Sequence, residues 1–331
     1  MIKNAIERAR SIAGRYVAGR FLLAAIDRFQ EQYVIGLAQQ VAYNLLFSLA
    51  PLLIFLTASV SLFAHSLNRD LESPAEPVLD WISKHVPSEV AAFIEDPVRS
   101  VLETDSNILL SFGGVLALWA ARNAVASTIR GLNATYGIRE VRPFFAHNAV
   151  ALLLTLGLVI SVVVISVVQL LGTRIGEEVA AQLGIPKLWN DLVERLQAPA
   201  TLAILVFMVL VLHRFGPTFK GPFRWYLPGA VFTIFGIIVA TWAFGEYFRF
   251  SSGYSAYGAL GAVLALMLWL FIVAMVTLIG GVINAALFET YPPAQRALAR
   301  FHADHPDERR TLEQLREAAS DLVERRSTKR S

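Results

Sequence analysis

A stretch of about 25 residues near the start of the chain, 39–63, carries no charged side chain. About 20 apolar residues in a helix cross the ~30 Å hydrocarbon core of a bilayer, so this stretch predicts a transmembrane helix. Polar residues and a proline recur along it at helical spacing, at Gln40, Asn44, Ser48 and Pro51. Because amide groups that face lipid lack hydrogen-bond partners, this polar face is predicted to meet other helices or a water-filled cavity.

The remaining apolar runs predict a polytopic membrane protein. Hydrophobic residues make up 55% of the 331 residues and charged residues only 17%, whereas soluble domains carry about 25% charge. The deficit of charge is concentrated in long apolar runs. We therefore predict an all-α fold with six transmembrane helices, at about 39–64, 108–129, 146–171, 200–215, 226–248 and 257–288.

The segments around these helices differ in character. The six-helix domain is predicted to span 38–288. The N-terminal segment 1–37 is amphipathic and basic, so it either lies in an anionic membrane surface or docks on the protein's own face. The outer loop 65–107 is predicted to hold short amphipathic helices, and 289–331 form a charged tail. No cleavable signal peptide is expected, because the first apolar run is too long for one.

Charge asymmetry predicts the orientation of the helices. With six spans, both termini lie on the same side of the membrane. That side carries 22 of the 29 Lys and Arg residues in its termini and connections, and the other side carries 7. Since positively charged short loops stay in the cytoplasm, we predict that both termini are cytoplasmic.

The sequence offers no recognisable catalytic motif. It has no cysteine, and its six histidines are scattered without the spacing of metal ligands. Glycine-rich nucleotide-binding loops and the G-x-S-x-G nucleophile motif are absent as well. We therefore expect no metal, no cofactor and no enzymatic activity. Topology already explains the basic inner loops, so no nucleic-acid partner is expected.

Polar residues at membrane depth are the candidate functional residues, because such residues are costly in lipid. The candidates for contact with a cavity or substrate are Gln40, Asn44, Ser48, Arg122, Asn123 and Asn284. The alternatives are hydrogen bonds between helices for the amides, and extension of the Arg122 guanidinium to the membrane interface. The candidate hinges are Gly216, Pro217, Gly280 and Gly281, which alternatively form a tight connection or a close helix contact.

Several motifs resemble the YihY/BrkB family. They are Q-x-x-A-Y-N-L-L-F-S-L-A-P at 39–51, L-W-A-A-R-N at 118–123, G-L-N-A-T-Y-G at 131–137, H-R-F-G-P at 213–217, P-G-A at 228–230, and Y-G-A-L-G, L-W-L and G-G-V-I-N-A between 257 and 285. The resemblance covers about residues 30–290. It implies a six-span protein of the bacterial inner membrane and supplies no catalytic residues. Many relatives carry an acidic residue where this chain has Val282, so no mechanism that needs a carboxylate there is expected.

These features predict transport or translocation of a lipid or another envelope-related amphiphile. The substrate would occupy a cavity between the first, second and sixth spans, where Arg122 attracts an anionic headgroup and Gln40 and Asn44 hydrogen-bond it. The alternative is a non-transporting scaffold that organises envelope proteins through 78–102 and the tail. The weakest hypothesis is a membrane-bound ribonuclease, an activity after which the family was once named. Membrane lipids and envelope proteins are the expected partners.

Overall fold

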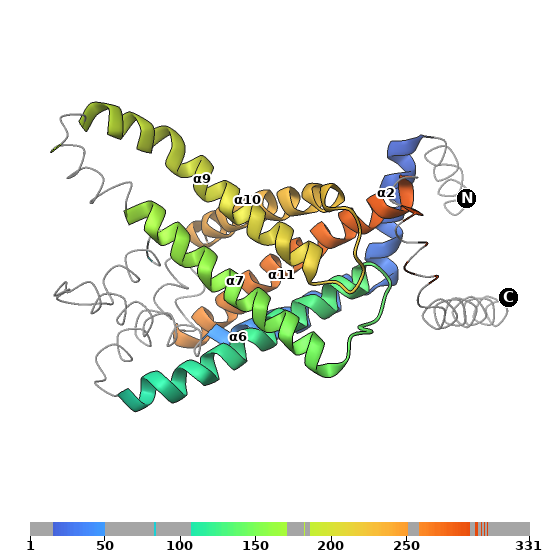
Figure 1. Cartoon of the computed structure of the whole chain (residues 1–331), viewed down its shortest axis with the longest axis horizontal. Coiled ribbons are helices and arrows are strands. Elements are labelled where there is room, and N and C mark those ends of the chain that lie inside the picture. Colours follow the sequence, from blue (N-terminus) through green and yellow to red (C-terminus); the bar gives the residue numbers. More distant parts are fainter. Residues whose placement is uncertain are drawn as a thin grey trace.

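The computed structural model describes residues 16–49, 107–170, 186–250 and 258–291, together with a few single residues (83, 182, 295, 296, 299, 301 and 303). These residues form helices and their connections, without a strand among them (Figure 1). The helices are α2 (Val17–Glu31), α6 (Asn107–Thr135), α7 (Phe144–Leu170), α9 (Pro186–Phe215), the 3₁₀ turn η2 (Phe223–Trp225), α10 (Leu227–Phe250) and α11 (Gly258–Thr290). A further helix, Val34–Leu49, is called the Val34 helix below.

The prediction of a helical membrane protein is confirmed. Four helical stretches of the described chain are long and apolar enough to cross a membrane, at Phe144–Gln169, Arg195–Phe215, Phe223–Tyr247 and Val263–Thr290. The Val34 helix is apolar but shorter. The rest of the predicted first span, nearly all of the predicted outer loop and most of the tail lie outside the described residues.

The fourth helix does not begin near residue 200, where the predicted span of 200–215 begins. Instead, α9 continues from Pro186 to Phe215 with Pro199 inside it. A proline removes one backbone donor and crowds the preceding turn. The helix nevertheless continues, because in an apolar environment the helix pairs the backbone groups of the long apolar run after Pro199.

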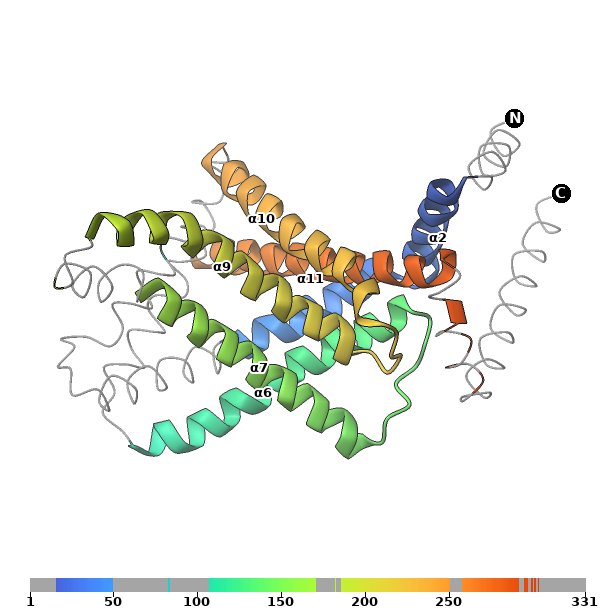
Figure 2. The same cartoon turned by 45° about the horizontal axis from the view of Figure 1, so that its top comes forward.

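The helices pack in a closed cycle. Helix α6 contacts α7, α7 contacts α9, α9 contacts α10, α10 contacts α11, and α11 returns to α6 (Figures 1 and 2). The Val34 helix packs against α6 and α11 through a buried apolar cluster of Val34, Ala38, Val41, Leu132, Ala274, Leu278 and Val282. Val282 therefore lies in an apolar contact between these helices.

Helix α2 lies across one end of this bundle, beside the last turns of α11 (Figures 1 and 2). We call this the α2 end. Arg28 donates to the Thr135 carbonyl at 2.7 Å and forms an ion pair with Glu289, so it joins α2 to α6 and α11. The predicted N-terminal helix breaks at Tyr33, whose φ of 50° is left-handed. Helix α2 thus contacts the protein's own helices, and a position in the membrane surface stays a prediction.

Candidate functional site

Arg122 lies in the contact between α6 and α7. Its Nη1 donates to the Asn123 Oδ1 at 3.0 Å, and its Nη2 donates to the Asn148 Oδ1 on α7. The guanidinium carbon lies 4.7 Å from the centre of the Trp119 ring, within the range of a cation–π interaction. Arg122 is only 8% exposed, and its contacts in the described chain include no carboxylate.

The polar atoms left over around Arg122 are all donors. A guanidinium only donates, so Asn123 and Asn148 must present their oxygens to it and keep their amide N–H groups for other partners. Neither amide nitrogen has a hydrogen bond within the described part of the chain. The Arg122 Nε is also buried without a partner among these residues. The site therefore has the chemistry of an anion receptor.

The predicted polar face of the first span makes different contacts. Asn44 donates to the Gln40 carbonyl at 2.8 Å and to the Ser127 Oγ of α6 at 3.1 Å. Ser48 is buried and donates to the Leu45 carbonyl in its own helix, at 2.8 Å. Gln40 is exposed, and Pro51 lies outside the described residues. Asn44 thus joins two helices, whereas Ser48 bonds within one.

The structure does not bring Asn44 and Arg122 together. Ser127, the α6 partner of Asn44, follows Arg122 by five residues, which places the two about 140° apart around the helix. Arg122 bonds α7, and Ser127 faces the Val34 helix. The predicted single cavity that combines these side chains is therefore not the arrangement seen.

Asn284 occupies a third place, at the contact of α9, α10 and α11. Its Oδ1 accepts from the Gly229 backbone N–H at 2.8 Å, and its Nδ2 lies 3.1 Å from the His213 Nδ1. Gly229 is the third residue of α10, so its N–H has no partner within that helix. The Asn284 side chain therefore caps α10 from a neighbouring helix.

This cap also sets the tautomer of His213. Because the Gly229 N–H must meet an oxygen, the nitrogen of the Asn284 amide faces the imidazole as a donor. His213 Nδ1 is then an acceptor, and the proton of the neutral ring resides on Nε2. His213 and Asn284 are both fully buried, so the three-helix node of Gly229, His213 and Asn284 is inaccessible to water in this conformation.

Helices α10 and α11 approach closely beside this node. A Cβ added at Gly229 would lie 2.2 Å from the Gly280 carbonyl oxygen, and one at Gly280 would lie 2.1 Å from the Thr233 Oγ1. A Cβ at Gly281 would lie 2.7 Å from the Leu132 side chain of α6. Gly280 and Gly281, predicted as hinge or packing residues, thus pack within the continuous helix α11; hinge motion there stays a prediction.

A second polar cluster, the Glu140 clasp, joins two connections at the α2 end. It consists of Asn133, Glu140, Arg142, His147 and Thr218. Glu140 accepts hydrogen bonds from Arg142 Nε at 2.7 Å, Thr218 Oγ1 at 3.0 Å and Asn133 Nδ2 at 3.0 Å, and it lies 2.8 Å from His147 Nδ1. Asn133 also accepts from the Thr218 N–H at 2.8 Å. The clasp therefore ties the α6–α7 connection to the segment after α9.

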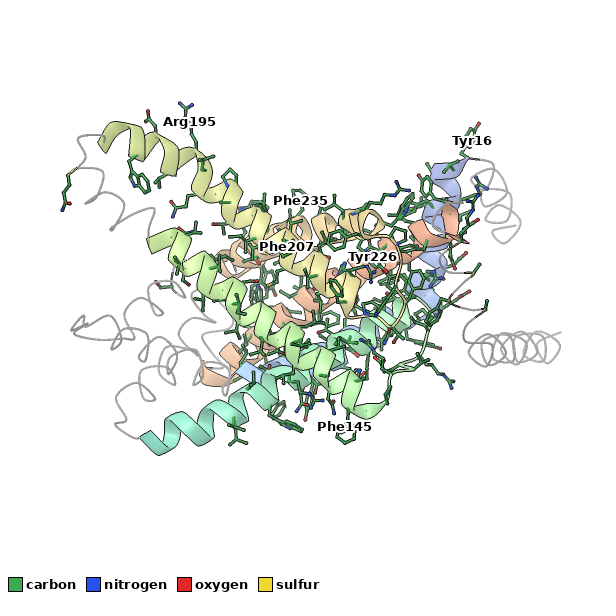
Figure 3. All side chains as sticks on the ribbon, in the orientation of Figure 1. Tyr16, Phe145, Arg195, Phe207, Tyr226 and Phe235 are labelled. Carbon is green, nitrogen blue, oxygen red and sulfur yellow. The ribbon has the colours of Figure 1, made fainter. Side chains whose placement is uncertain are left out.

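The clasp holds the predicted hinge at Gly216 and Pro217. Arg142 donates to the Gly216 carbonyl, and both predicted hinge residues are buried. Nearby, the Tyr226 hydroxyl accepts from the Gly221 N–H at 2.9 Å and donates to the Phe219 carbonyl at 3.3 Å. Tyr226 lies inside the α2 end (Figure 3). This connection is a packed turn, and rotation about it stays a prediction.

The Glu140 carboxylate is expected to stabilise the fold in a pH-dependent way. Burial raises the pKa of Glu140, but hydrogen bonds from Arg142 and His147 outweigh it and lower the pKa below its ordinary value. The stabilisation is therefore present at neutral pH and is lost as the pH falls through the lowered pKa. We expect Glu140→Gln to reduce the free energy of unfolding at pH 7 by about 1–2 kcal/mol, and to flatten its acid dependence.

The measurement is chemical unfolding of the purified protein between pH 3 and pH 7. Glu31→Gln removes an exposed carboxylate on α2 and is the control. Equal losses of stability in the two variants would contradict the role of the clasp.

Sequence reasoning missed three contributors to these contacts. The sequence shows His213 as one of six scattered histidines and Glu140 as one acid in a short connection. Neither of these residues, nor Asn148, is among the predicted site residues. The available signal was position, because Asn148 and Glu140 flank the start of α7 and His213 precedes the end of α9. The partners of each residue become visible only when the helices are packed.

Comparison with known proteins identifies relatives. A family model described as Virulence factor BrkB matches residues 25–304. The chain is 29% identical to the putative ribonuclease-like protein YfkH of Bacillus subtilis, over 75% of this chain and 88% of that protein. It is 25% identical to a UPF0761 membrane protein of Neisseria meningitidis serogroup B, over 85% of this chain and 66% of that protein. A UPF0761 membrane protein of Xanthomonas axonopodis pv. citri is 24% identical, over 92% and 74% respectively.

No solved structure matches the chain significantly. The family match spans the Val34 helix and every described helix from α6 to α11. Two of the three relatives are named as membrane proteins, in agreement with the four apolar helices found here. The chain therefore belongs to the virulence factor BrkB family, the YihY/BrkB family that its motifs resemble.

Proposed function

We propose that this protein moves a lipid or another envelope-related amphiphile across the bacterial inner membrane. The observation that carries the proposal is Arg122, a buried cation in the α6–α7 contact whose neighbours include no carboxylate in the described chain. Charged groups within membrane helices commonly mark the path of a substrate or ion. An amphiphile with an anionic headgroup would supply the missing negative charge. The proposal involves no enzymatic step, metal or cofactor.

The proposal uses six spans with both termini in the cytoplasm. Besides the four apolar helices, α6 has 29 residues, a length of about 43 Å. The sequence predicts the remaining span at about 39–64, which begins within the Val34 helix. The connections at the α2 end carry Arg139, Arg142, Lys220 and Arg224, which supports a cytoplasmic position for that end.

Lipid translocation by the purified chain tests the proposal. In vesicles of phosphatidylethanolamine and phosphatidylglycerol, we expect the protein to speed the exchange of acyl-labelled phospholipid between leaflets. Arg122→Ala should slow this exchange about tenfold, because it removes charge-assisted hydrogen bonds worth about 1.5–3 kcal/mol. Bleaching of the outer-leaflet label by a membrane-impermeant reductant measures the rate.

Arg130→Ala is the matched control, since Arg130 is an exposed cation on the same helix. Exchange no faster than in protein-free vesicles would contradict translocation of these lipids. Equal rates for the wild type and Arg122→Ala would remove Arg122 from the mechanism.

A non-transporting scaffold is the second candidate, and the three-helix node favours it. A fully buried Asn284 with both amide atoms engaged is typical of a closed, dry bundle. The chain has no cysteine, so single cysteines report alone. Protection of cysteines at both 148 and 284 from an impermeant thiol reagent would support the scaffold, whereas labelling at 148 alone would support a wet site beside Arg122.

A further inference from the structure

We propose that α6 and α7 form a lateral binding site for a phosphate-bearing, net-anionic glycerolipid, held by Arg122, Asn123 and Asn148 beside Trp119. The inference rests on the proposed function and names both its substrate class and the side of entry. The lipid would enter from the leaflet at the α2 end, between two helices, rather than through the interior of the bundle.

The donor set selects an oxyanion. The Arg122 Nε and the amide nitrogens of Asn123 and Asn148 are donors without partners in the described chain. A buried cation without a counter-ion is unfavourable, and so are buried donors without acceptors. An anion that accepts hydrogen bonds from these donors reduces both costs. Phosphate has several acceptor oxygens and matches the planar fork of a guanidinium, so one phosphate can serve more than one of these donors.

The surroundings select a lipid over a free anion. Trp119 is 57% exposed and lies against the guanidinium, and Val115 on the preceding turn is exposed as well. At the start of α7, Phe144 is exposed and Phe145 is 84% exposed. Phe145 projects away from the bundle (Figure 3). Trp119 and Val115 lie on the side of Arg122 away from the α2 end, where acyl chains can pack, and Phe144 and Phe145 lie on the side of the connection.

The depth of the site fits a headgroup. Asn148 lies four residues after the first residue of α7, which is about 6 Å of helical rise. That end of α7 faces the α2 end of the bundle, where Arg139 and Arg142 lie in the connection. A tryptophan at this level suits the membrane interface. Through Asn148, Arg122 therefore lies about one helical turn from the start of α7, where we place the headgroup layer of that leaflet.

Charge selects an anionic headgroup over a zwitterionic one. The described residues place no carboxylate against Arg122. A headgroup with its own cation, as in phosphatidylcholine, would bring a second positive charge toward Arg122. Phosphatidylglycerol brings none, so it is the better match.

Ligand-induced stabilisation of the purified full-length chain tests the site. The probes are dihexanoyl phosphatidylglycerol, dihexanoyl phosphatidylcholine and inorganic phosphate, and the readout is the unfolding temperature against probe concentration. We expect phosphatidylglycerol to bind at least about tenfold more tightly than either other probe. Arg122→Lys keeps the charge but loses the fork, and Asn148→Leu removes one donor; each should weaken phosphatidylglycerol about tenfold.

Arg20→Gln, which removes an exposed cation on α2, should leave binding unchanged. Equal binding of the two lipids would overturn the preference for anions. Phosphate binding as tight as phosphatidylglycerol would mean a free-anion site and overturn the lipid. Unchanged binding in both site variants would overturn the location. If the probes bind as expected while vesicles show no translocation, the lipid site is supported and the proposed function fails. If vesicles show translocation but the probes do not bind as expected, the proposed function is supported and the lipid site fails.

Discussion

Gly229→Ala and Gly280→Ala should each destabilise the protein by about 3 kcal/mol, the upper end of the usual cost of overpacking. The new methyl group would lie 2.2 Å from the Gly280 carbonyl oxygen in the first variant, and 2.1 Å from the Thr233 hydroxyl in the second. The nearest atom in the first case is backbone, which cannot rotate away. Relief therefore requires α10 and α11 to separate. Thermal unfolding of the detergent-solubilised protein, together with its yield in membranes, measures the effect.

Gly245→Ala is the matched control for this prediction. Gly245 lies in the same helix as Gly229, and a Cβ added there meets nothing within 4 Å. Since alanine is favoured over glycine in a helix by about 1 kcal/mol, this variant should be as stable as the wild type or more so. Destabilisation of all three variants by the same amount would show that the close α10–α11 contact is not the cause.

Asn284→Leu should cost about 2–3 kcal/mol, because it removes the cap of α10 and leaves two buried groups unpaired. The Gly229 N–H loses its acceptor, and the His213 Nδ1 loses its donor. Each unpaired buried group costs about 1–3 kcal/mol, whereas leucine regains part of this through apolar contacts. Chemical unfolding of the purified protein measures the loss.

Thr277→Val provides the control on the same helix. The Thr277 hydroxyl donates to the Val273 carbonyl one turn away in its own helix, at 2.8 Å, and valine keeps the shape of the side chain. We expect a change below about 1 kcal/mol. If Asn284→Leu is as mild as Thr277→Val, the three-helix node contributes no specific stability. Asn284→Asp would keep the acceptor for Gly229, so recovery of part of the stability in that variant would identify the cap as the larger contribution.

The positions of the helices could be predicted from the sequence where a helix coincides with one long apolar run. The observed α7, α10 and α11 begin and end within about two residues of the predicted spans, because a chain in lipid has few other ways to pair its backbone. Helix α9 differs because local rules favour a break near Pro199, while the surrounding helix tolerates the proline. Local propensity and the long-range environment conflict there, and the environment prevails.

The candidate site was predictable only residue by residue. Arg122 and Asn284 stood out as polar groups in apolar runs, and both are buried in the structure. Their partners could not be found, since Asn148 lies 26 residues from Arg122 and His213 lies 71 from Asn284. Periodicity states which face of a helix is polar but not which helix that face meets. The residues expected around one cavity between three spans therefore lie in three separate contacts, those of Asn44, Arg122 and Asn284.

The ion pair of Arg28 with Glu289 has a consequence for biosynthesis. The two residues are 261 positions apart, so the pair cannot form until nearly all of the described chain has left the ribosome. Until then α2 lacks its anchor on α11. Such non-local contacts close late in folding. Docking of α2 on α11 would thus mark completed assembly, and a chain that stops short of α11 would leave α2 without this anchor and open to quality-control proteases.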